Sequence, residues 1–542
     1  MHLEATNIKF ADITIRNNIN EIRNNYEQQM EEIKAQFEEQ IKTLKINLLE
    51  TENKYLVLKE QYDLLVYRRF GRSAEQLLRD EKQPLLFTEG ETAKAECEGE
   101  KPEEPKKVNS YQRRNGGRKP ISPNLSRRER IIDISEDEKN CACGAKLVKI
   151  GEETSEKVEI IPPVVFVDKI IRPKYACRCC EGTEDEDKPV VRIAPVEPSI
   201  IPKGIASPSL LSTIITQKYQ LHLPYYRQEK QFEDIGVILS RQDMVNWQQQ
   251  VYKKLIILLI MLKVTVKSWP VLQMDETTVQ VIGEDGRDDT QKSYMWVARG
   301  GPPDKKVIWY EYHTTRAAYH AKEFLEGYSG YLQTDGYRGY VVAVKEIPGI
   351  IQVGCFAYAR RKFFEAAKAG KEPGSAQIGI DFIRKLYEIE KKLRSQWEED
   401  KQTEKFLLDR KKACEPVLKE FRSWLDKRKD EVPESTNLGK AISYSLNQWD
   451  KLIAYLESPY LTPDNNACEN AIRPFVIGRK NWLFNQSPEG AESSAGMYTL
   501  IETAKQNGLV PFKYLMALFQ KAPFATSTED WEKLLPWNIF QN

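Results

Sequence analysis

Apolar side chains recur at steps of three and four residues from about residue 15 to residue 66. The positions between them are mostly Glu, Lys, Gln and Asn, and neither Gly nor Pro interrupts the stretch. This spacing predicts one long helix with an apolar a/d seam of about seven heptads, including one or two stutters. Because such a helix cannot bury a narrow apolar stripe by itself, we expect residues 1–80 to form a dimerising coiled coil. Folding back of the helix onto its own chain is the alternative.

Four further segments differ from this one in composition and periodicity. Residues 81–108 are rich in Glu, Lys and Pro and poor in apolar groups, which predicts a disordered linker. Residues 109–200 begin with a basic segment and continue with short runs of β-branched residues bounded by Pro or Gly, which predict strands at 158–162, 164–171 and 190–193. Residues 201–264 show three short helical patterns, one of them capped by Ser240 with Asp243. Three short helices are typical of a helix-turn-helix DNA-binding region, although they also occur in many other settings.

The pattern after residue 264 predicts an α/β core. Three consecutive strands are expected at 271–281, 293–299 and 306–312, then a helix at about 317–325 and a strand that ends at Asp335. Residues from about 360 to 458 are highly charged and have the pattern of an inserted helical block. We therefore expect a multidomain α+β or α/β protein. Its core would comprise residues 265–505, followed by a C-terminal region at 506–542.

Composition and charge narrow the class of protein. A chain of 542 residues exceeds the usual size of one core, and its net charge of +1 gives no overall sign of a nucleic-acid partner. Neither a secretory leader nor an apolar run of about 20 residues occurs, so we expect a cytoplasmic, nucleoid-associated protein without a membrane partner. Residues 101–130 nevertheless hold ten Lys or Arg against three Glu, and a solvated linker is the alternative to DNA binding there. The candidate phosphate contacts in this stretch are Arg113, Arg114, Arg118 and Lys119.

The cysteines fall into two close groups. Cys141 and Cys143 form the first, and Cys177 and Cys180 form the second, about 34 residues later. Two such groups are typical of a tetrahedral structural zinc site, because each short loop presents two thiolates to one ion. The first group is C-x-C instead of the usual C-x2-C. Reduced cysteines buried in a small β module are the alternative.

Three acidic residues are candidates for catalysis. Asp275 lies within an apolar strand, and Asp335 ends another strand. A charge within a sheet is costly unless it is paired or bound to metal, and two such strands are how an RNase H-like core assembles a magnesium site. Glu469 lies at an expected helix start. Their hard oxygen ligands suit magnesium or manganese, and two bound ions could activate a water or a 3′-hydroxyl. Taken singly, each is more typical of a surface or capping residue, since the chain has 80 acidic residues.

Basic residues follow Glu469. If the helix continues past Pro474, Arg473 and Lys480 share a face with Glu469, with Arg479 beside them, and these cations could contact a DNA phosphate. A simple i,i+4 ion pair between Glu469 and Arg473 is the alternative.

Short motifs over nearly the whole chain resemble, in order, those of the insertion-sequence 66 transposase family. They are Phe70-Gly-Arg-Ser-Ala-Glu75, His222-Leu-Pro-Tyr-Tyr-Arg-Gln228, Gln273-Met-Asp-Glu-Thr277, Thr334-Asp-Gly-Tyr-Arg-Gly339, Cys355-Phe-Ala-Tyr-Ala-Arg-Arg-Lys362, Asn466-Ala-Cys-Glu-Asn-Ala-Ile-Arg473, Gly478-Arg-Lys-Asn-Trp-Leu-Phe484 and Thr499-Leu-Ile-Glu-Thr-Ala-Lys-Gln-Asn-Gly508. The resemblance implies a leucine-zipper-like N-terminus, a zinc-finger-like module and an RNase H-like DDE core with a helical insertion. It also implies that Asp275, Asp335 and Glu469 are the catalytic triad. Tyr358 departs from the His that family members commonly carry, and the C-x-C group is one residue short.

These observations together predict a DNA transposase. It would bind the terminal inverted repeats of its element as a homo-oligomer, at least a dimer, and carry out metal-dependent cleavage and strand transfer into target DNA. Small accessory proteins are conceivable further partners. A non-catalytic DNA-binding regulator derived from a transposase is an alternative, although all three acids are present. An RNase H-like nuclease without strand transfer is another, although it would not need the coiled coil and the end-binding modules.

Overall fold

The computed structural model describes residues 23–62 in part, and residues 165–176, 191–369, 374–397 and 402–540. The predicted linker at 81–108, the four basic residues between 113 and 119 and the four cysteines proposed for zinc lie outside the described residues. By its internal contacts the chain divides into two units, residues 74–173 and the remainder. In the first unit only residues 165–173 are described, and they contain no regular secondary structure. The remainder contains the N-terminal helix, a small hairpin and a mixed α/β core.

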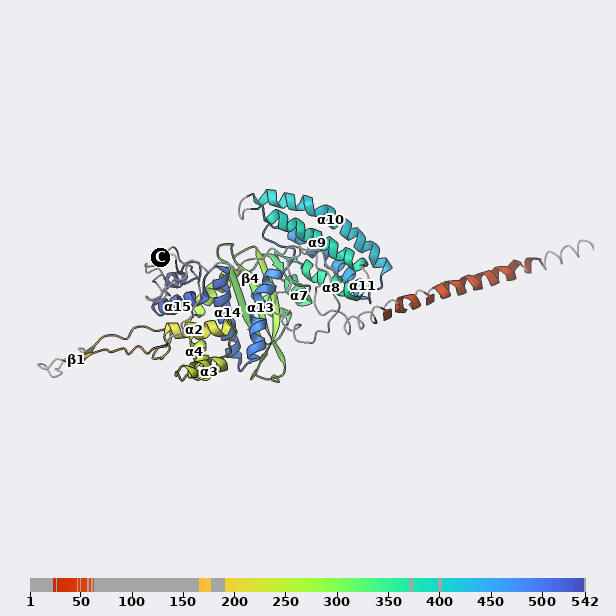
Figure 1. Ribbon diagram of the computed structural model, residues 1–542. Helices are drawn as coiled ribbons and strands as arrows, with labels where there is room; N and C mark the ends of the chain where they lie inside the picture. The colour runs from red at the N-terminus through yellow and green to blue at the C-terminus, as the bar shows by residue number, and fades with distance from the viewer. Residues whose placement is uncertain are drawn as a thin grey trace, which may run out of the picture. The chain divides into compact units, whose positions relative to one another are not determined.

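The described residues between 23 and 62 are helical, which confirms the predicted helix (Figure 1). In the single chain its seam is exposed to solvent. The exposed seam residues are Met30, Ile33, Phe37, Ile41, Leu44, Leu48, Tyr55, Leu58 and Tyr62. Pairing of this seam with a second chain remains a prediction.

Strands β1 (Lys174–Ala176) and β2 (Val191–Ile193) form an antiparallel hairpin. Strand β2 confirms the prediction at 190–193. The predicted strand at 164–171 is wrong over its described residues, 165–171, which are irregular and exposed. A β-branched run becomes a strand only where a neighbouring strand accepts its backbone hydrogen bonds, and none pairs with 165–171 within the described part of the chain.

Helices α2 (Pro208–Tyr219), α3 (Tyr225–Asp234) and α4 (Arg241–Lys254) confirm the three predicted helices, and α5 (Ile256–Val266) follows them. The hydroxyl of Ser240 caps α4 by accepting a hydrogen bond from the Asp243 amide. These helices are not a separate module. Buried residues of α2, among them Ile214 and Tyr219, belong to the same hydrophobic cluster as the central sheet, and α2 packs on α14 (Pro488–Gln506) and α15 (Pro511–Lys521).

The central sheet begins with an antiparallel meander of β3 (Val271–Val281), β4 (Lys292–Gly300) and β5 (Val307–His313), as predicted. Helix α6 (Ala318–Leu325) leads to β6 (Gly330–Gln333), and helix α7 (Arg338–Lys345) leads to β7 (Ile350–Val353). Strand β6 pairs in parallel with β3 and with β7. The strand order is β5-β4-β3-β6-β7, and β8 (Phe484–Asn485) pairs with the far end of β3.

The register leaves part of β3 with a neighbouring strand on one side only. Its pairing with β6 ends at Gln273 opposite Gln333, and its pairing with β8 begins at Gln280. Residues 274–279 therefore have a strand neighbour, β4, on one side only. The sheet is open at this edge.

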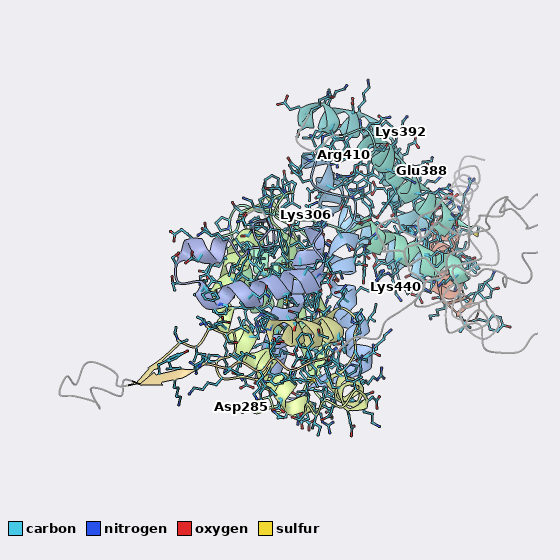
Figure 2. All side chains as sticks on the ribbon, turned by 60° about the vertical axis from the view of Figure 1, so that its left-hand side comes forward. Asp285, Lys306, Glu388, Lys392, Arg410 and Lys440 are labelled. Atoms are coloured by element: carbon cyan, nitrogen blue, oxygen red, sulfur yellow. The ribbon has the colours of Figure 1, made fainter. Side chains whose placement is uncertain are left out.

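The segment from β7 to the end of the predicted insertion is helical, with its own hydrophobic cluster (Figure 1). It comprises α8 (Phe356–Ala369), α9 (Ser375–Arg394), α10 (Thr403–Glu431), α11 (Asn437–Asn447), α12 (Trp449–Ile453) and η4 (Ala454–Glu457). Arg410 of α10, labelled in Figure 2, is fully buried there. It forms an ion pair with Glu390 of α9 and donates hydrogen bonds to the carbonyls of Tyr455, Ser458 and Leu461. These hydrogen bonds from Arg410 hold residues 455–461, which lie in the segment that leads back to the sheet.

The last elements are α13 (Asn466–Trp482), α14 (Pro488–Gln506), α15 (Pro511–Lys521), η5 (Ala522–Phe524) and α16 (Thr528–Glu532). Helix α14 covers the edge strand β5. Thr499 and Thr503 accept hydrogen bonds from β5 amides, and Asn507 donates to the carbonyl of the residue just before β5.

The spacing of the threonines along α14 matches the spacing of the amides that they bond along β5. Four helical residues rise about 6 Å, close to the length of two strand residues. The motif at 499–508 therefore satisfies backbone groups that would otherwise be unpaired at the edge of the sheet. The packing is continuous across residue 505, the boundary predicted for the core. Among the described residues, no helix combines the length and the apolarity needed to cross a membrane.

Candidate active site

The three predicted catalytic acids meet at the open edge of β3. Asp275 lies in β3, Asp335 follows β6, and Glu469 is in the first turn of α13. Burial raises the pKa of Asp275 well above its ordinary value, and the charges of Asp335 and Glu469 raise it further, as does the adjacent Glu276. Burial likewise raises the pKa of Glu469, with Asp335 contributing. The structure thus brings together three carboxylates that lie far apart in the sequence.

Arginines lie beside Asp335 and Glu469, whereas no described cation pairs with Asp275. Asp275 forms no ion pair with any described residue, and its Oδ1 accepts a hydrogen bond only from the Glu276 amide, at 2.9 Å. Arg316 Nη2 is 3.9 Å from Asp335 Oδ2, and Arg361 Nη2 is 3.8 Å from Glu469 Oε2. The side chains of Asp335 and Glu469 are 29% and 33% exposed, so both are accessible from solvent. The cluster therefore carries excess negative charge.

The donor set suits a hard divalent cation. A buried carboxylate without a cationic partner, such as Asp275, is costly, and a bound metal ion would remove that cost. Within the described residues, no three His, Cys, Asp or Glu side chains are grouped tightly enough to hold one metal ion by themselves. Magnesium usually takes only one or two carboxylates and completes its coordination with water and substrate phosphate. The carboxylates therefore fit a site that is completed by a phosphate ligand.

A buried chain of amides aligns the two strands that carry the aspartates. Gln273 Nε2 donates to Gln333 Oε1 at 2.8 Å, across β3 and β6, and each glutamine stands two residues before an aspartate. Gln333 Nε2 also donates to the carbonyl of Thr462 at 2.7 Å, in the segment before α13. Both glutamines are buried. The same polar chain therefore reaches all three segments that carry the acids.

Asn465 fastens the start of α13 to the sheet. Its side-chain Nδ2 donates to the carbonyl of Met274 at 3.0 Å, on the open edge of β3. Its backbone N–H donates to Cys355 Sγ at 3.4 Å. Asn465 is 1% exposed. Because Glu469 stands one helical turn later, this contact sets the position of Glu469 relative to Asp275.

Helix α13 continues through Pro474, as the predicted common face of Glu469, Arg473 and Lys480 requires. Arg473 lies near enough to Glu469 to lower its pKa, and Lys480 is exposed. Arg479 differs from these two, because its Nη1 donates to the hydroxyls of Thr277 and Thr278 in β3. Arg479 thus ties α13 to the strand.

Four residues of this site were not selected from the sequence. Arg361 stands within the motif at 355–362 and lies beside Glu469. Glu276 and Arg316 form an ion pair, and Tyr340 donates a hydrogen bond to Glu276. The position of Glu276 beside Asp275 is the one sequence signal that could have suggested Glu276. Nothing in the sequence places Arg316 near β3.

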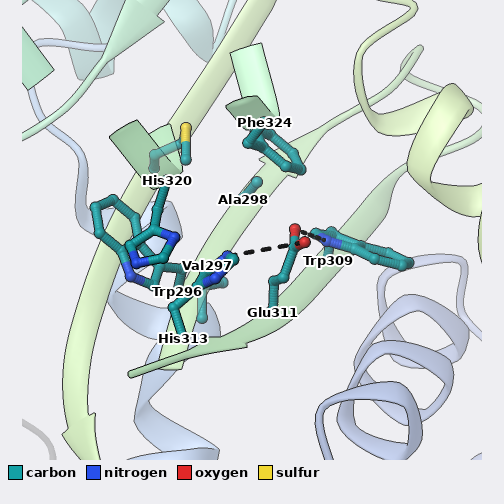
Figure 3. A pocket seen from close by; sticks show the side chains of 9 residues that line it. Trp296, Val297, Ala298, Trp309, Glu311, His313, His320 and Phe324 are labelled. Atoms are coloured by element: carbon teal, nitrogen blue, oxygen red, sulfur yellow. Dashed lines mark hydrogen bonds and ion pairs between the residues drawn. The ribbon is translucent and has the colours of Figure 1, made fainter. Parts of the chain in front are cut away.

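A small pocket lies apart from the acids, among β4, β5 and α6 (Figure 3). His313 and His320 stack there with ring centres 3.9 Å apart, and Glu311 accepts hydrogen bonds from Trp309 and Lys263. Burial, together with His313, lowers the pKa of His320 to about 4. The cavity of about 10 Å³ holds at most one water. This pocket is too small for a substrate.

Comparison with known proteins gives four family matches. A model described as "Transposase IS66 family" matches residues 203–493, and "IS66 C-terminal element" matches 499–537. The model "zinc-finger binding domain of transposase IS66" matches 138–181, a range that includes all four predicted zinc ligands. The model "Transposase C of IS166 homeodomain" matches 57–130.

Curated relatives come from Sinorhizobium fredii (strain NBRC 101917 / NGR234). The uncharacterized protein y4jD is 31% identical over 419 residues, which cover 75% of this chain and 79% of y4jD. The uncharacterized protein y4qI is 30% identical over 487 residues, 86% of each chain.

Proposed function

Because the chain belongs to the IS66 family of transposases, we propose that it binds the ends of its mobile element, cleaves a phosphodiester there and joins the freed 3′ end to target DNA. One observation carries this proposal. Asp275, Asp335 and Glu469 come from three separate elements to the open edge of β3, where burial and the neighbouring carboxylates raise the pKa of Asp275 and of Glu469.

We propose that β3–β7 with their helices form an RNase H-like core. The support is a mixed sheet in which an antiparallel meander is extended by two parallel strands, with the two aspartates on neighbouring strands β3 and β6. The helical block from α8 to η4 would be its insertion, and the contacts of Gln333 with Thr462 and of Asn465 with Met274 would fasten the segment that follows the block to the sheet.

Asp275, Asp335 and Glu469 would hold magnesium or manganese. Bound divalent cations would supply Lewis-acid activation of the attacking oxygen and neutralise charge on the leaving oxygen. The protein residues themselves would position the DNA. Arg361 and Arg473 beside Glu469 would receive a phosphate, with Lys480 further along the same exposed face of α13.

The remaining modules would select and pair the DNA ends. We propose that Cys141, Cys143, Cys177 and Cys180 bind structural zinc, which the zinc-finger family match supports. The basic segment that contains Arg113, Arg114, Arg118 and Lys119 would contact DNA phosphates. The exposed seam of the N-terminal helix would pair two chains, so that one assembly holds two element ends.

The test is a cleavage and strand-transfer assay with the full-length protein, labelled element-end DNA, target plasmid and magnesium. We expect the wild type to cleave and join, and Asp275→Asn or Glu469→Gln to abolish both steps while end binding persists in a gel-shift assay. Asp285→Asn, an exposed acid in the turn after β3, is the matched control. Cleavage by Glu469→Gln at the wild-type rate would contradict its assignment. End binding without cleavage by the wild type would indicate a regulator, and cleavage without joining a simple nuclease.

A further inference from the structure

Glu276 is a buried acid whose place in β3 needs an explanation. Its side chain is 1% exposed. As the strand neighbour of Asp275 it points to the opposite face of the sheet, because successive strand residues alternate. Tyr340 of α7 donates its hydroxyl to Glu276, and Arg316, from the segment between β5 and α6, forms an ion pair with it. Two elements thus supply donors to this one carboxylate.

Arg316 is held firmly by its surroundings. Its Nε and Nη2 face Glu276, and the centre of its guanidinium lies 3.6 Å from the centre of the Tyr337 ring. Tyr337 in turn donates its hydroxyl to the carbonyl of Arg316 at 2.9 Å. A guanidinium that is stacked and paired before a ligand arrives loses little further freedom on binding.

The same guanidinium extends to the edge where the three acids meet. Its Nη2 is 3.9 Å from Asp335 Oδ2, beyond hydrogen-bonding distance, and the side chain is 37% exposed. Its Nη1 donates no hydrogen bond within the described residues. One edge of the planar group is therefore occupied by Glu276, and another is available to a ligand at Asp335.

We propose that Arg316 is a phosphate-binding residue of the catalytic site, contacting the DNA phosphate that lies at Asp335. This role rests on the proposed transposase function. Glu276 and Tyr337 are the positioning residues that aim Arg316.

The charges of the site explain why such a cation is needed. DNA phosphate approaches a cluster of carboxylates and is repelled unless cations flank its path. Arg361 provides a cation on the Glu469 side, and Arg316 provides one on the Asp335 side. Arginine suits this position because its fork can keep one edge on a carboxylate while another edge binds phosphate.

The experiment compares the full-length wild type with Arg316→Gln, Arg316→Lys and the double variant Glu276→Gln/Arg316→Gln. Arg422→Gln is the matched control, because Arg422 is a half-exposed arginine of α10 that pairs with Asp426. Three quantities are measured for each protein: the urea midpoint of unfolding, element-end binding without divalent metal, and the single-turnover cleavage rate with magnesium.

We expect Arg316→Gln to cleave about 100-fold more slowly while end binding changes by less than about threefold. Arg316→Lys keeps the charge but not the fork, so its loss should be smaller, about tenfold. The double variant should regain stability, because neither partner of the buried pair is left charged and alone, yet cleave as slowly as Arg316→Gln.

The double variant separates phosphate binding from structural support. If Arg316 only neutralised Glu276, removal of both charges would restore cleavage with stability, and that result would overturn the inference. Cleavage by Arg316→Gln within about threefold of the wild-type rate would also overturn it. Absence of cleavage by the wild type, or persistence of cleavage in Asp275→Asn, would instead overturn the proposed function and the inference with it.

Discussion

Asn465 joins the start of α13 to β3, and Asn465→Ala tests whether this contact positions Glu469. The substitution removes the donor that Nδ2 gives to the carbonyl of Met274 at 3.0 Å. That carbonyl faces the open edge of β3, where no other strand supplies a donor among the described residues. The side chain is 1% exposed, so water does not readily replace it.

The size of the effect follows from these contacts. Leaving a buried carbonyl unpaired costs about 1–3 kcal/mol. Asn465 Oδ1 is itself buried without a partner among the described residues, and alanine removes this unpaired acceptor as well. We therefore expect the free energy of unfolding to fall by the lower part of that range, about 1–2 kcal/mol. Misplacement of a catalytic group by about 1 Å costs on the order of 100-fold in rate. Cleavage should thus fall far more than stability.

The assay pairs urea unfolding with single-turnover cleavage of element-end DNA in magnesium. Asn538→Ala is the control, because Asn538 Nδ2 also donates to a backbone carbonyl, that of Glu532 at 2.8 Å, but at a solvent-exposed site near the C-terminus. We expect the control to change neither quantity appreciably. Cleavage by Asn465→Ala within about threefold of the wild-type rate would refute the reasoning that this contact sets the position of Glu469.

Three further predictions concern stability. Burial lowers the pKa of Lys218 to about 7, whereas the unfolded chain keeps this proton up to about pH 10. The unfolding free energy should therefore rise between pH 7 and 10 by at most about 1.4 kcal/mol per pH unit. The same dependence on pH in Lys218→Met would contradict this prediction. Arg410→Leu should lower the unfolding free energy by about 3–5 kcal/mol, because it leaves the buried carbonyls of Tyr455 and Ser458 without a donor and the buried carboxylate of Glu390 with Arg394 alone. The control Arg422→Leu removes a half-exposed ion pair and should lower the unfolding free energy, measured in urea, by less than about 1 kcal/mol. Equal losses of unfolding free energy in the Arg410 and Arg422 variants would contradict the prediction. Thr503→Val should lower the unfolding free energy by about 1–3 kcal/mol, because the Thr503 hydroxyl bonds both the amide and the carbonyl of one β5 residue. Thr213→Val, at an exposed hydroxyl, should lower it little. Similar urea midpoints for the two variants would contradict this prediction.

The elements of the core were largely predictable because their signals are local. The strands at 271–281, 293–299 and 306–312 agree with β3, β4 and β5 to within a residue or two. Apolar alternation and flanking turn residues mark such strands within a few positions. The run at 164–171 carried the same signal and failed over its described residues, because β-propensity has no effect without a pairing partner.

The candidate site was predictable only in part. Asp275 and Asp335 were selected because a charge inside or at the end of an apolar strand is costly, and this cost is visible in the sequence. Glu469 was singled out by its motif and by the family resemblance. Arg316 escaped notice because no local pattern indicates that the segment between β5 and α6 returns to the edge of β3.

The sequence by itself therefore determined where helices and strands form and which acids a fold would need to neutralise. The tertiary structure alone decided the open edge of β3, the pairing of Gln273 with Gln333 and the contact between Asn465 and Met274. The residues of these two contacts lie 60 and 191 positions apart in the chain. Secondary structure depends on neighbours a few residues away, whereas such contacts exist only once the whole core has packed and brought distant segments together.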